Sequence, residues 1–337
     1  MSTKKMRIKD LALLLAIAVL CVGIFSVSAF ATEGAIASGE AGEGIAWEIS
    51  ADGTLTISGS GEPAVEWYNP PWLPYKERIR SVVFAEGITG IPGSVICYLE
   101  NLTTISIPST VQLVNSIAIS ASRAITEINV SADNPYYKSE DGILFTKDGA
   151  VLVRFPAGKI VEEYTIPESV TRISGSAFED NRGINTVNIH GGVESIGNAA
   201  FAYTTIKEIN LSEGLKTIDN SAFSSNPMTE FVVPDSVTEI GNNAFYANDL
   251  ESFVLGSGIQ KIGSHVFAYN SYLEVIHYNG TEETWSTVEL GAGFDKEVHF
   301  VELKDGIAAS CNEGNSAGLY CAIQRIFPPF PKAPLAP

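Results

Sequence analysis

Apolar residues recur along the chain between Val170 and Tyr278 with a period of 22 or 23 residues. In each of five segments an isoleucine is followed five positions later by a phenylalanine, and another apolar residue stands three positions before the isoleucine. The phenylalanines are Phe178, Phe201, Phe223, Phe245 and Phe267. A period of this length is typical of stacked supersecondary units, so it predicts a solenoid and lowers the expectation of an enzyme.

Each unit also contains a short alternating run, such as Ile184, Val187 and Ile189, after a polar patch. Alternation with period two predicts a strand with one buried face. Burying about seven apolar groups per unit contributes roughly 10–20 kcal/mol, whereas ordering about 22 backbones costs on the order of 20–40 kcal/mol. One unit therefore cannot fold alone, and its neighbours must share the burial.

Weaker copies of the strand extend the pattern upstream. They are the apolar pairs Val82/Phe84, Ile105/Ile107, Ile128/Val130 and Tyr164/Ile166, whose first members are 23, 23 and 36 residues apart. The longest step indicates an insertion at about 132–159, where Asp148-Gly149 between apolar runs predicts a hairpin. We therefore expect a mostly β solenoid of about nine 22–23-residue units over residues 79–301.

The amino-terminal side of the repeats predicts a cap. Residues 45–58 form two alternating runs around Asp52-Gly53, which is typical of a β-hairpin. With the aromatic and proline stretch that follows, residues 32–78 are predicted to cover the first layer of the stack. Trp67, Trp72 and Tyr75 could instead form a sugar-stacking platform, but we favour packing because a cap must bury the edge of an apolar column.

Residues 1–31 have the pattern of a secretory signal peptide. Basic residues precede an apolar run from Leu11 to Phe25, and Ala29 and Ala31 provide a cleavage site. Fifteen apolar residues are short for the roughly 20 that span a bilayer. We therefore predict a secreted or cell-surface protein that meets a membrane only through the uncleaved signal segment.

The charge and cysteine content narrow the choice of partners. The net charge of −18 becomes −21 without residues 1–31, because 17 basic and 38 acidic side chains remain. Such an acidic surface disfavours nucleic acid as a partner. A disulfide between Cys311 and Cys321 would close a short loop and leave Cys97 as a lone thiol. The histidines lie in different units, so we predict neither a metal site nor a cofactor.

The units resemble the BspA-type leucine-rich repeat of bacterial surface and secreted proteins. The resemblance covers about residues 45–301 and rests on V-x-x-I-G-x-x-A-F, as in 237–245, and on strand ends such as Ile166-Pro167 and Val233-Pro234. It implies a leucine-rich-repeat solenoid that binds host, matrix or neighbouring-cell proteins and has no catalytic residues. Residues 302–337 are similar to a cysteine-containing module but end in a proline-rich tail, so a truncated or frameshifted end is an open alternative.

The outward positions of the strands are the candidate ligand-binding face. They should form one strip at strand spacing, roughly 4.8 Å per step. A solvated sheet face is the alternative interpretation, but three valines stand where solvent would favour polar side chains, which suggests a protein-contact surface. The candidate residues are Thr186, Asn188, Glu208, Asn210, Glu230, Val232, Ser252, Val254, Val275 and His277.

Two other function classes remain open. Secreted parallel β-helix enzymes that act on polysaccharides have a similar period, but they need carboxylates that face one cleft. Here only Glu208 and Glu230 stack at equivalent outward positions, and they are too close for an inverting pair. A glycan is a second candidate partner, bound through Trp67 and Trp72 in a carbohydrate-binding module. We interpret the Asn and Asp residues after each phenylalanine as turn formers.

Overall fold

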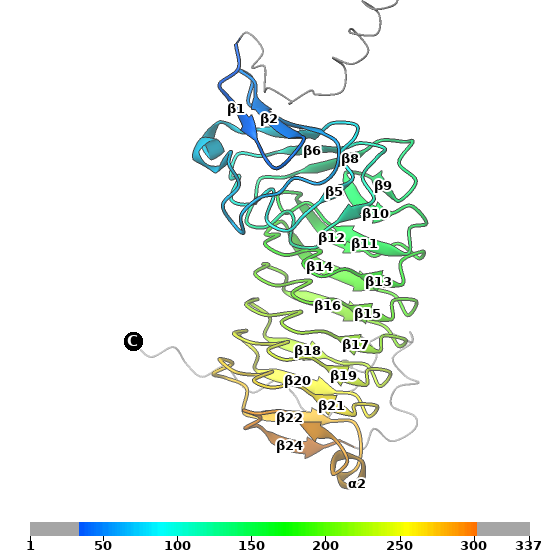
Figure 1. Ribbon diagram of the computed structural model, residues 1–337. Coiled ribbons are helices and arrows are strands. Elements are labelled where there is room, and N and C mark those ends of the chain that lie inside the picture. Colours follow the sequence, from blue (N-terminus) through cyan, green and yellow to red (C-terminus); the bar gives the residue numbers. More distant parts are fainter. Residues whose placement is uncertain (1–33, 302–337) are drawn as a thin grey trace, which may run out of the picture.

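The computed structural model describes residues 34–301, which form an elongated stack of coils (Figure 1). The stack is a mostly β solenoid of about 11 turns. The predicted fold is therefore confirmed, and it has more turns than the nine units that we expected. The difference lies at the two ends, where strands β3 (Thr54–Gly59) and β24 (Glu297–Phe300) each extend the parallel column of long strands.

One long strand per coil makes up the first column of the stack. Equivalent apolar residues stand in register, as Ile105 does with Ile128 and Val187 with Ile209, so each buried row continues from coil to coil. The remaining long strands are β4 (Ser81–Phe84), β6 (Thr104–Ile107), β8 (Glu127–Val130), β12 (Val161–Thr165), β14 (Ile184–Ile189), β16 (Glu208–Leu211), β18 (Glu230–Val232), β20 (Ser252–Leu255) and β22 (Val275–Tyr278).

A second column consists of two-residue strands, most of which contain the repeated isoleucine (Figure 1). Here the coils approach closely, since a β-carbon at Gly241 or Gly263 would lie 2.5 Å from a backbone nitrogen of the preceding coil. At these two coils glycine after the isoleucine is therefore a steric requirement, whereas Ser174 and Asp219 follow the isoleucine in other coils. The strands are β5 (Gly90–Ile91), β7 (Leu113–Val114), β13 (Arg172–Ile173), β15 (Ser195–Ile196), β17 (Thr217–Ile218), β19 (Glu239–Ile240), β21 (Lys261–Ile262) and β23 (Glu289–Leu290).

The amino-terminal cap is an antiparallel meander. Strands β1 (Ala37–Glu40), β2 (Ile45–Ile49) and β3 pair in sequence, which confirms the hairpin at Asp52-Gly53. Because β3 also pairs in parallel with β4, the last strand of the cap is at the same time the first long strand of the solenoid. A 3-10 helix (Leu73–Arg78) follows these strands and lies within the predicted cap, residues 32–78.

The insertion is built into the stack. Strands β10 (Ile143–Thr146) and β11 (Val151–Arg154) form the hairpin predicted around Asp148-Gly149, and β9 (Tyr137–Glu140) adds a third antiparallel strand. Strand β11 then pairs in parallel with β13. It therefore begins the downstream column of short strands, and the insertion closes the gap between two series of coils.

A ladder of phenylalanines runs through the downstream interior. The side chains of Phe178, Phe201 and Phe223 are fully buried, and their ring centroids are 4.6 and 5.3 Å apart with nearly parallel planes. The ladder begins one coil earlier than the sequence predicted, because Phe155 stacks on Phe178 at 5.0 Å. It continues through Phe245 and Phe267. Upstream, a separate core of aliphatic residues and tryptophans fills the coils.

Buried asparagines link the turns after the phenylalanines. The Asn226 side-chain nitrogen donates to the carbonyls of Phe201 and Phe223, both at 2.9 Å, and its oxygen accepts from the amide of Thr204 at 3.0 Å. Asn248 and Asn270 make equivalent bonds to the preceding coil. Our interpretation of these residues as local turn formers was therefore incomplete, because they connect neighbouring coils.

The carboxyl-terminal end of the described chain carries a single-turn helix, α2 (Glu282–Trp285), which Thr281 caps. No helix within residues 34–301 is long and apolar enough to cross a membrane. The predicted signal segment, Cys311, Cys321 and the proline-rich tail lie outside the described residues.

Candidate functional site

The outward side chains of the long strands line up in two columns along the stack. In the first column, Thr186 and Glu208 stand side by side, as do Glu230 and Ser252. In the second, Asn188 pairs with Asn210, and Val232 with Val254. The candidate residues therefore share one surface, which we call the strand face. Strands β16 and β18 belong to different sheets, so the hydrogen-bonded ladder is interrupted between them.

The half of the strand face nearest the insertion is a hydrogen-bonded polar network. Asn210 donates its side-chain nitrogen to the Asn188 side-chain oxygen at 2.9 Å, and Asn188 donates to Glu163 Oε1 at 2.5 Å and to Thr165 Oγ1 at 3.2 Å. Glu163 and Thr165 on β12 thus extend both columns by one coil. We had missed them as site residues, although the Tyr164/Ile166 pair fixes their outward direction in the sequence.

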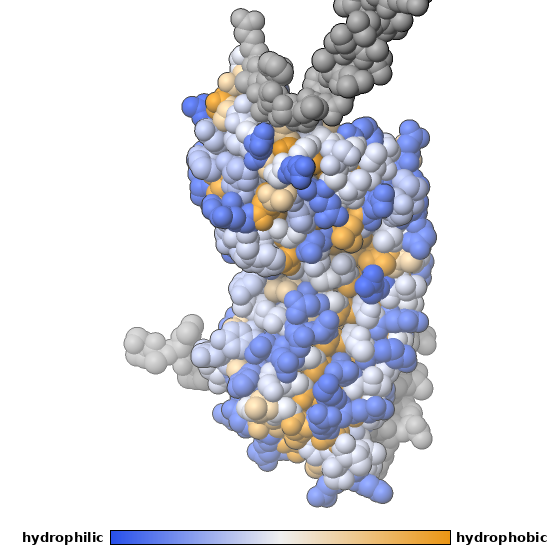
Figure 2. Space-filling model, in the orientation of Figure 1, coloured by the Kyte–Doolittle hydropathy of each residue, from blue (hydrophilic) through white to orange (hydrophobic). Residues whose placement is uncertain are grey.

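The other half of the strand face is more apolar. Val232 and Val275 are partly exposed, as expected for a contact surface, whereas Val254 is only 3% exposed. Val254 stands between Val232 and His277 in its column. The expectation of three exposed valines is therefore correct for two of them. Figure 2 shows an apolar strip that runs lengthwise down this part of the stack.

A histidine pair lies at the end of the apolar half. His277 on β22 and His299 on β24 are in register, and their ring centroids are 5.9 Å apart. Burial and the neighbouring His299 lower the pKa of His277. The His299 Nε2 lies 3.2 Å from Glu297 Oε1. Glu297 and His299 continue the two columns, and extending the 22-residue register by one strand would have found them.

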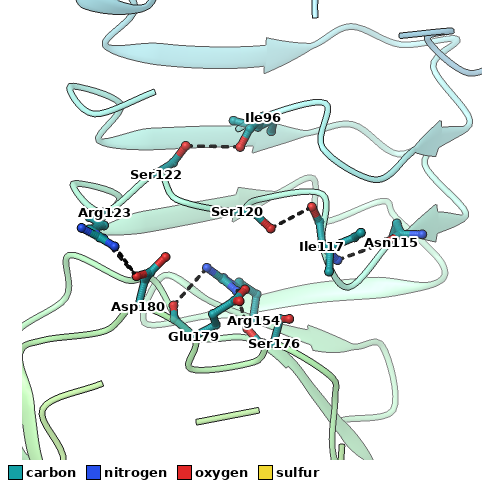
Figure 3. Close-up of polar contacts among 10 residues, drawn as sticks. All are labelled: Ile96, Asn115, Ile117, Ser120, Ser122, Arg123, Arg154, Ser176, Glu179 and Asp180. Carbon is teal, nitrogen blue, oxygen red and sulfur yellow. Dashed lines mark hydrogen bonds and ion pairs between the residues drawn. The ribbon is translucent and has the colours of Figure 1, made fainter. Parts of the chain in front are cut away.

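Charged side chains meet at the junction between the two series of coils (Figure 3). Arg154 is buried and donates to the Ser176 carbonyl and, at 3.3 Å, to the Glu179 carbonyl. Burial raises the pKa of Glu179, and the nearby Arg154 guanidinium opposes the rise. Arg123 of an upstream coil donates from Nε to Asp180 Oδ1 at 3.0 Å. This network joins the two series, and sequence patterns gave no signal for it because its partners are 57 residues apart.

The structure separates the three aromatic residues of the alternative sugar platform. Trp72 is fully buried, its Nε1 donates to the Val95 carbonyl at 3.1 Å, and its ring meets Trp47 edge-on. Trp72 is therefore a core residue, and the assignment of sugar binding to it is wrong. Trp67 remains 66% exposed.

The remaining chemical candidates are few. Glu208 and Glu230 are both exposed on the strand face. Within residues 34–301 there is no cluster of three His, Cys, Asp or Glu side chains that could hold a metal ion. Cys97 is a fully buried thiol whose pKa is raised by burial, so it is unreactive in the folded state.

Comparison with known proteins supports the repeat assignment. A sequence profile described as the BspA type leucine rich repeat region matches residues 74–140 and 155–274 in six copies, which together exceed half of the chain. No curated protein matches the chain.

Two solved structures share the fold. A leucine-rich cell surface protein from Faecalibacterium prausnitzii A2-165 is 18% identical with a TM-score of 0.54, covering 77% of this chain and 98% of the other. The pneumococcal vaccine antigen PcpA is 16% identical with a TM-score of 0.53, covering 80% and 100%.

Proposed function

The chain belongs to the BspA type leucine-rich repeat family, and from this premise we propose that it is a secreted or cell-surface interaction protein that binds a protein ligand through its strand face, in the manner of an adhesin. The pattern of residues 1–31 and the cell-surface description of one structural relative support the location. No cofactor is needed for this function.

One observation supports the strand face above other surfaces. Its second column changes from hydrogen-bonded amides at Asn188 and Asn210 to valines at Val232 and Val254 without any change of strand direction. The partly exposed Val232 beside the carboxylate of Glu230 resembles a protein interface, in which an apolar centre has a polar rim. The amide network is rigid because its members bond one another, which lowers the entropy cost of binding there.

The test uses charge substitutions on the strand face. Purified protein is passed over a panel of immobilised extracellular matrix proteins, and affinities for any ligand are measured by surface plasmon resonance. Val232→Glu and Val275→Glu should weaken binding by about tenfold or more, because a carboxylate in an apolar contact must be desolvated. The matched control is Ser195→Glu on β15, which lies on the short-strand column. Equal affinities for all three variants and the unmodified protein would show that the ligand binds elsewhere.

The enzyme alternative has less support. Glu208 and Glu230 are exposed side chains on the strand face, whereas a catalytic pair needs a site that positions sugar between the carboxylates. Release of reducing sugar from a polysaccharide, abolished by Glu208→Gln, is the result that would favour it.

A further inference from the structure

Three aromatic side chains form an exposed row near the amino-terminal end of the stack. Trp67, Tyr68 and Tyr98 are 66%, 36% and 42% exposed. The ring centroids of Trp67 and Tyr68 are 5.3 Å apart and those of Tyr68 and Tyr98 are 5.8 Å apart. We call these residues the aromatic row. Its three rings are neighbours, so the row is one continuous surface and not a scatter of single exposed side chains.

A tight turn presents two of the rings. The amide of Asn69 donates to the Glu66 carbonyl at 3.1 Å, and the Asn69 side-chain nitrogen donates to Glu66 Oε2 at 3.0 Å. Trp67 and Tyr68 occupy the two central positions of this turn. The Trp67 ring rests near the backbone of Gly93, where an added β-carbon would lie 3.4 Å from Cζ3. The turn and its contact with the first coils therefore hold the rings in place.

Tyr68 adopts a backbone conformation that bulky residues rarely adopt. Its φ is 56°, in the left-handed region, where glycine or asparagine is favoured in turns. A tyrosine at this position opposes the local preference for glycine, although its ring is not buried in the core. The same conformation recurs in the turns of the stack, for example at Tyr98, Tyr203 and Tyr269, so it presents the Tyr68 ring at the surface without by itself marking a ligand site.

We propose that the aromatic row binds a neutral oligosaccharide, independently of the protein ligand of the strand face. A pyranose ring has one face of C–H groups and a rim of hydroxyls, so it can stack on an aromatic face and form hydrogen bonds at its edge. Trp67 and Tyr68 meet at 87°, which forms a corner for one sugar, and Tyr98 lies one ring further along. Glu66 and Asn69 at the turn supply the polar groups.

The net charge of the chain and the geometry of the three rings indicate which class of ligand fits the aromatic row. The chain has a net charge of −18, and Glu66 lies at the turn, so uronates and sialylated glycans are repelled. A quaternary ammonium group is best held by rings that face a common centre. In the aromatic row the rings of Trp67 and Tyr68 meet edge to face, and the rings of Tyr68 and Tyr98 are tilted by 49°. Because the three rings are spread along the surface, the row favours an extended neutral oligosaccharide chain.

The test uses full-length protein on an array of neutral oligosaccharides, followed by calorimetry with each oligosaccharide that binds. Uronic acid oligosaccharides and choline serve as competing probes. We expect binding of a neutral oligosaccharide that Trp67→Ala weakens roughly tenfold or more. Tyr68→Gly should weaken binding as well. The melting temperature of this variant should be unchanged or higher, because glycine adopts the left-handed backbone conformation without strain. This second variant separates lost binding from misfolding.

Two control variants complete the design. Tyr272→Ala removes a tyrosine that is 69% exposed at the other end of the stack, and it should bind the oligosaccharide normally. Val275→Glu on the strand face should also bind it normally, so this proposal and the proposed function can fail separately. The absence of any neutral ligand, binding of uronates or choline alone, or full affinity in Trp67→Ala would overturn the proposal.

Discussion

Upstream of the insertion, Ile96 and Ile119 occupy the interior turn position, whereas downstream a stack of phenylalanines from Phe155 to Phe267 occupies it. The backbone bonds are nevertheless the same. The amide of Ile96 donates to the Ala118 carbonyl at 2.9 Å, as the amide of Phe201 donates to the Ala222 carbonyl at 2.8 Å. The coil therefore requires this bond and a large apolar side chain, and ring stacking is an addition that only the downstream series has.

Truncating the phenylalanine ladder should have the largest effect. Phe201 is fully buried between Phe178 and Phe223, so Phe201→Ala should destabilise the downstream coils by about 3–5 kcal/mol. Because the two series have separate cores, hydrogen exchange read peptide by peptide should show faster opening downstream first. The matched upstream variant is Ile96→Ala, in which hydrogen exchange should become faster first in the upstream coils. Equal loss of protection along the whole chain in either variant would mean that the two cores unfold as one.

Removing a buried asparagine should have the next largest effect. Asn226→Ala leaves the Phe201 carbonyl and the amide and hydroxyl of Thr204 without this partner, while the Phe223 carbonyl still accepts from Asn248. The expected cost is about 1–3 kcal/mol for a buried unsatisfied group. Upstream, Ser122 accepts from the Leu99 amide and donates to the Ile96 carbonyl, both through one hydroxyl. Ser122→Ala should therefore cost less, about 1 kcal/mol. Urea denaturation monitored by tryptophan fluorescence measures both, and a larger loss for Ser122→Ala would contradict the comparison.

At the junction between the two series, Glu179→Gln should change the pH dependence of stability. Burial raises the pKa of Glu179 above its ordinary value of 4.5 in the folded protein, so the folded state holds the proton more tightly than the unfolded state. The stabilisation that the protonated Glu179 carboxyl contributes is fully present below the ordinary pKa of 4.5. It is lost as the pH rises through the pKa that Glu179 has in the folded protein. Glutamine cannot ionise, so the variant should gain stability relative to the unmodified protein as pH increases above 4.5.

Thermal melts in a series of buffers test this expectation at the junction. Glu251→Gln is the matched control, because the Glu251 side chain is exposed. Parallel pH profiles for Glu179→Gln and the unmodified protein would show that the Glu179 carboxyl titrates normally.

The sequence predicted the regular parts of the two series and missed the connections between them. The period located every long strand from Val82 to Tyr278, since one apolar residue per coil must face the interior. Phe155 was missed because the insertion interrupts the spacing, and the Arg123 to Asp180 contact was missed because it has no periodic signal. On the strand face, the outward direction of the side chains was predictable from the alternation of apolar and polar residues, but the burial of Val254 was not.

Relieving the backbone of the shared turn should have the smallest effect, and it tests the similarity between the two series directly. Ala121 upstream and Ala247 downstream each lie two residues after the interior residue of their coil, and both have positive φ, 54° and 53°. Because alanine is strained in this region and glycine is not, Ala121→Gly and Ala247→Gly should each stabilise the protein by about 0.5–1 kcal/mol, after the entropy that glycine loses on folding. The control is Ala85→Gly, at a position without positive φ, which should not stabilise. Equal gains in thermal melts at both sites would show that aliphatic and aromatic interiors support one backbone turn, and a gain at Ala247 alone would show that the phenylalanine stack itself imposes the strained conformation.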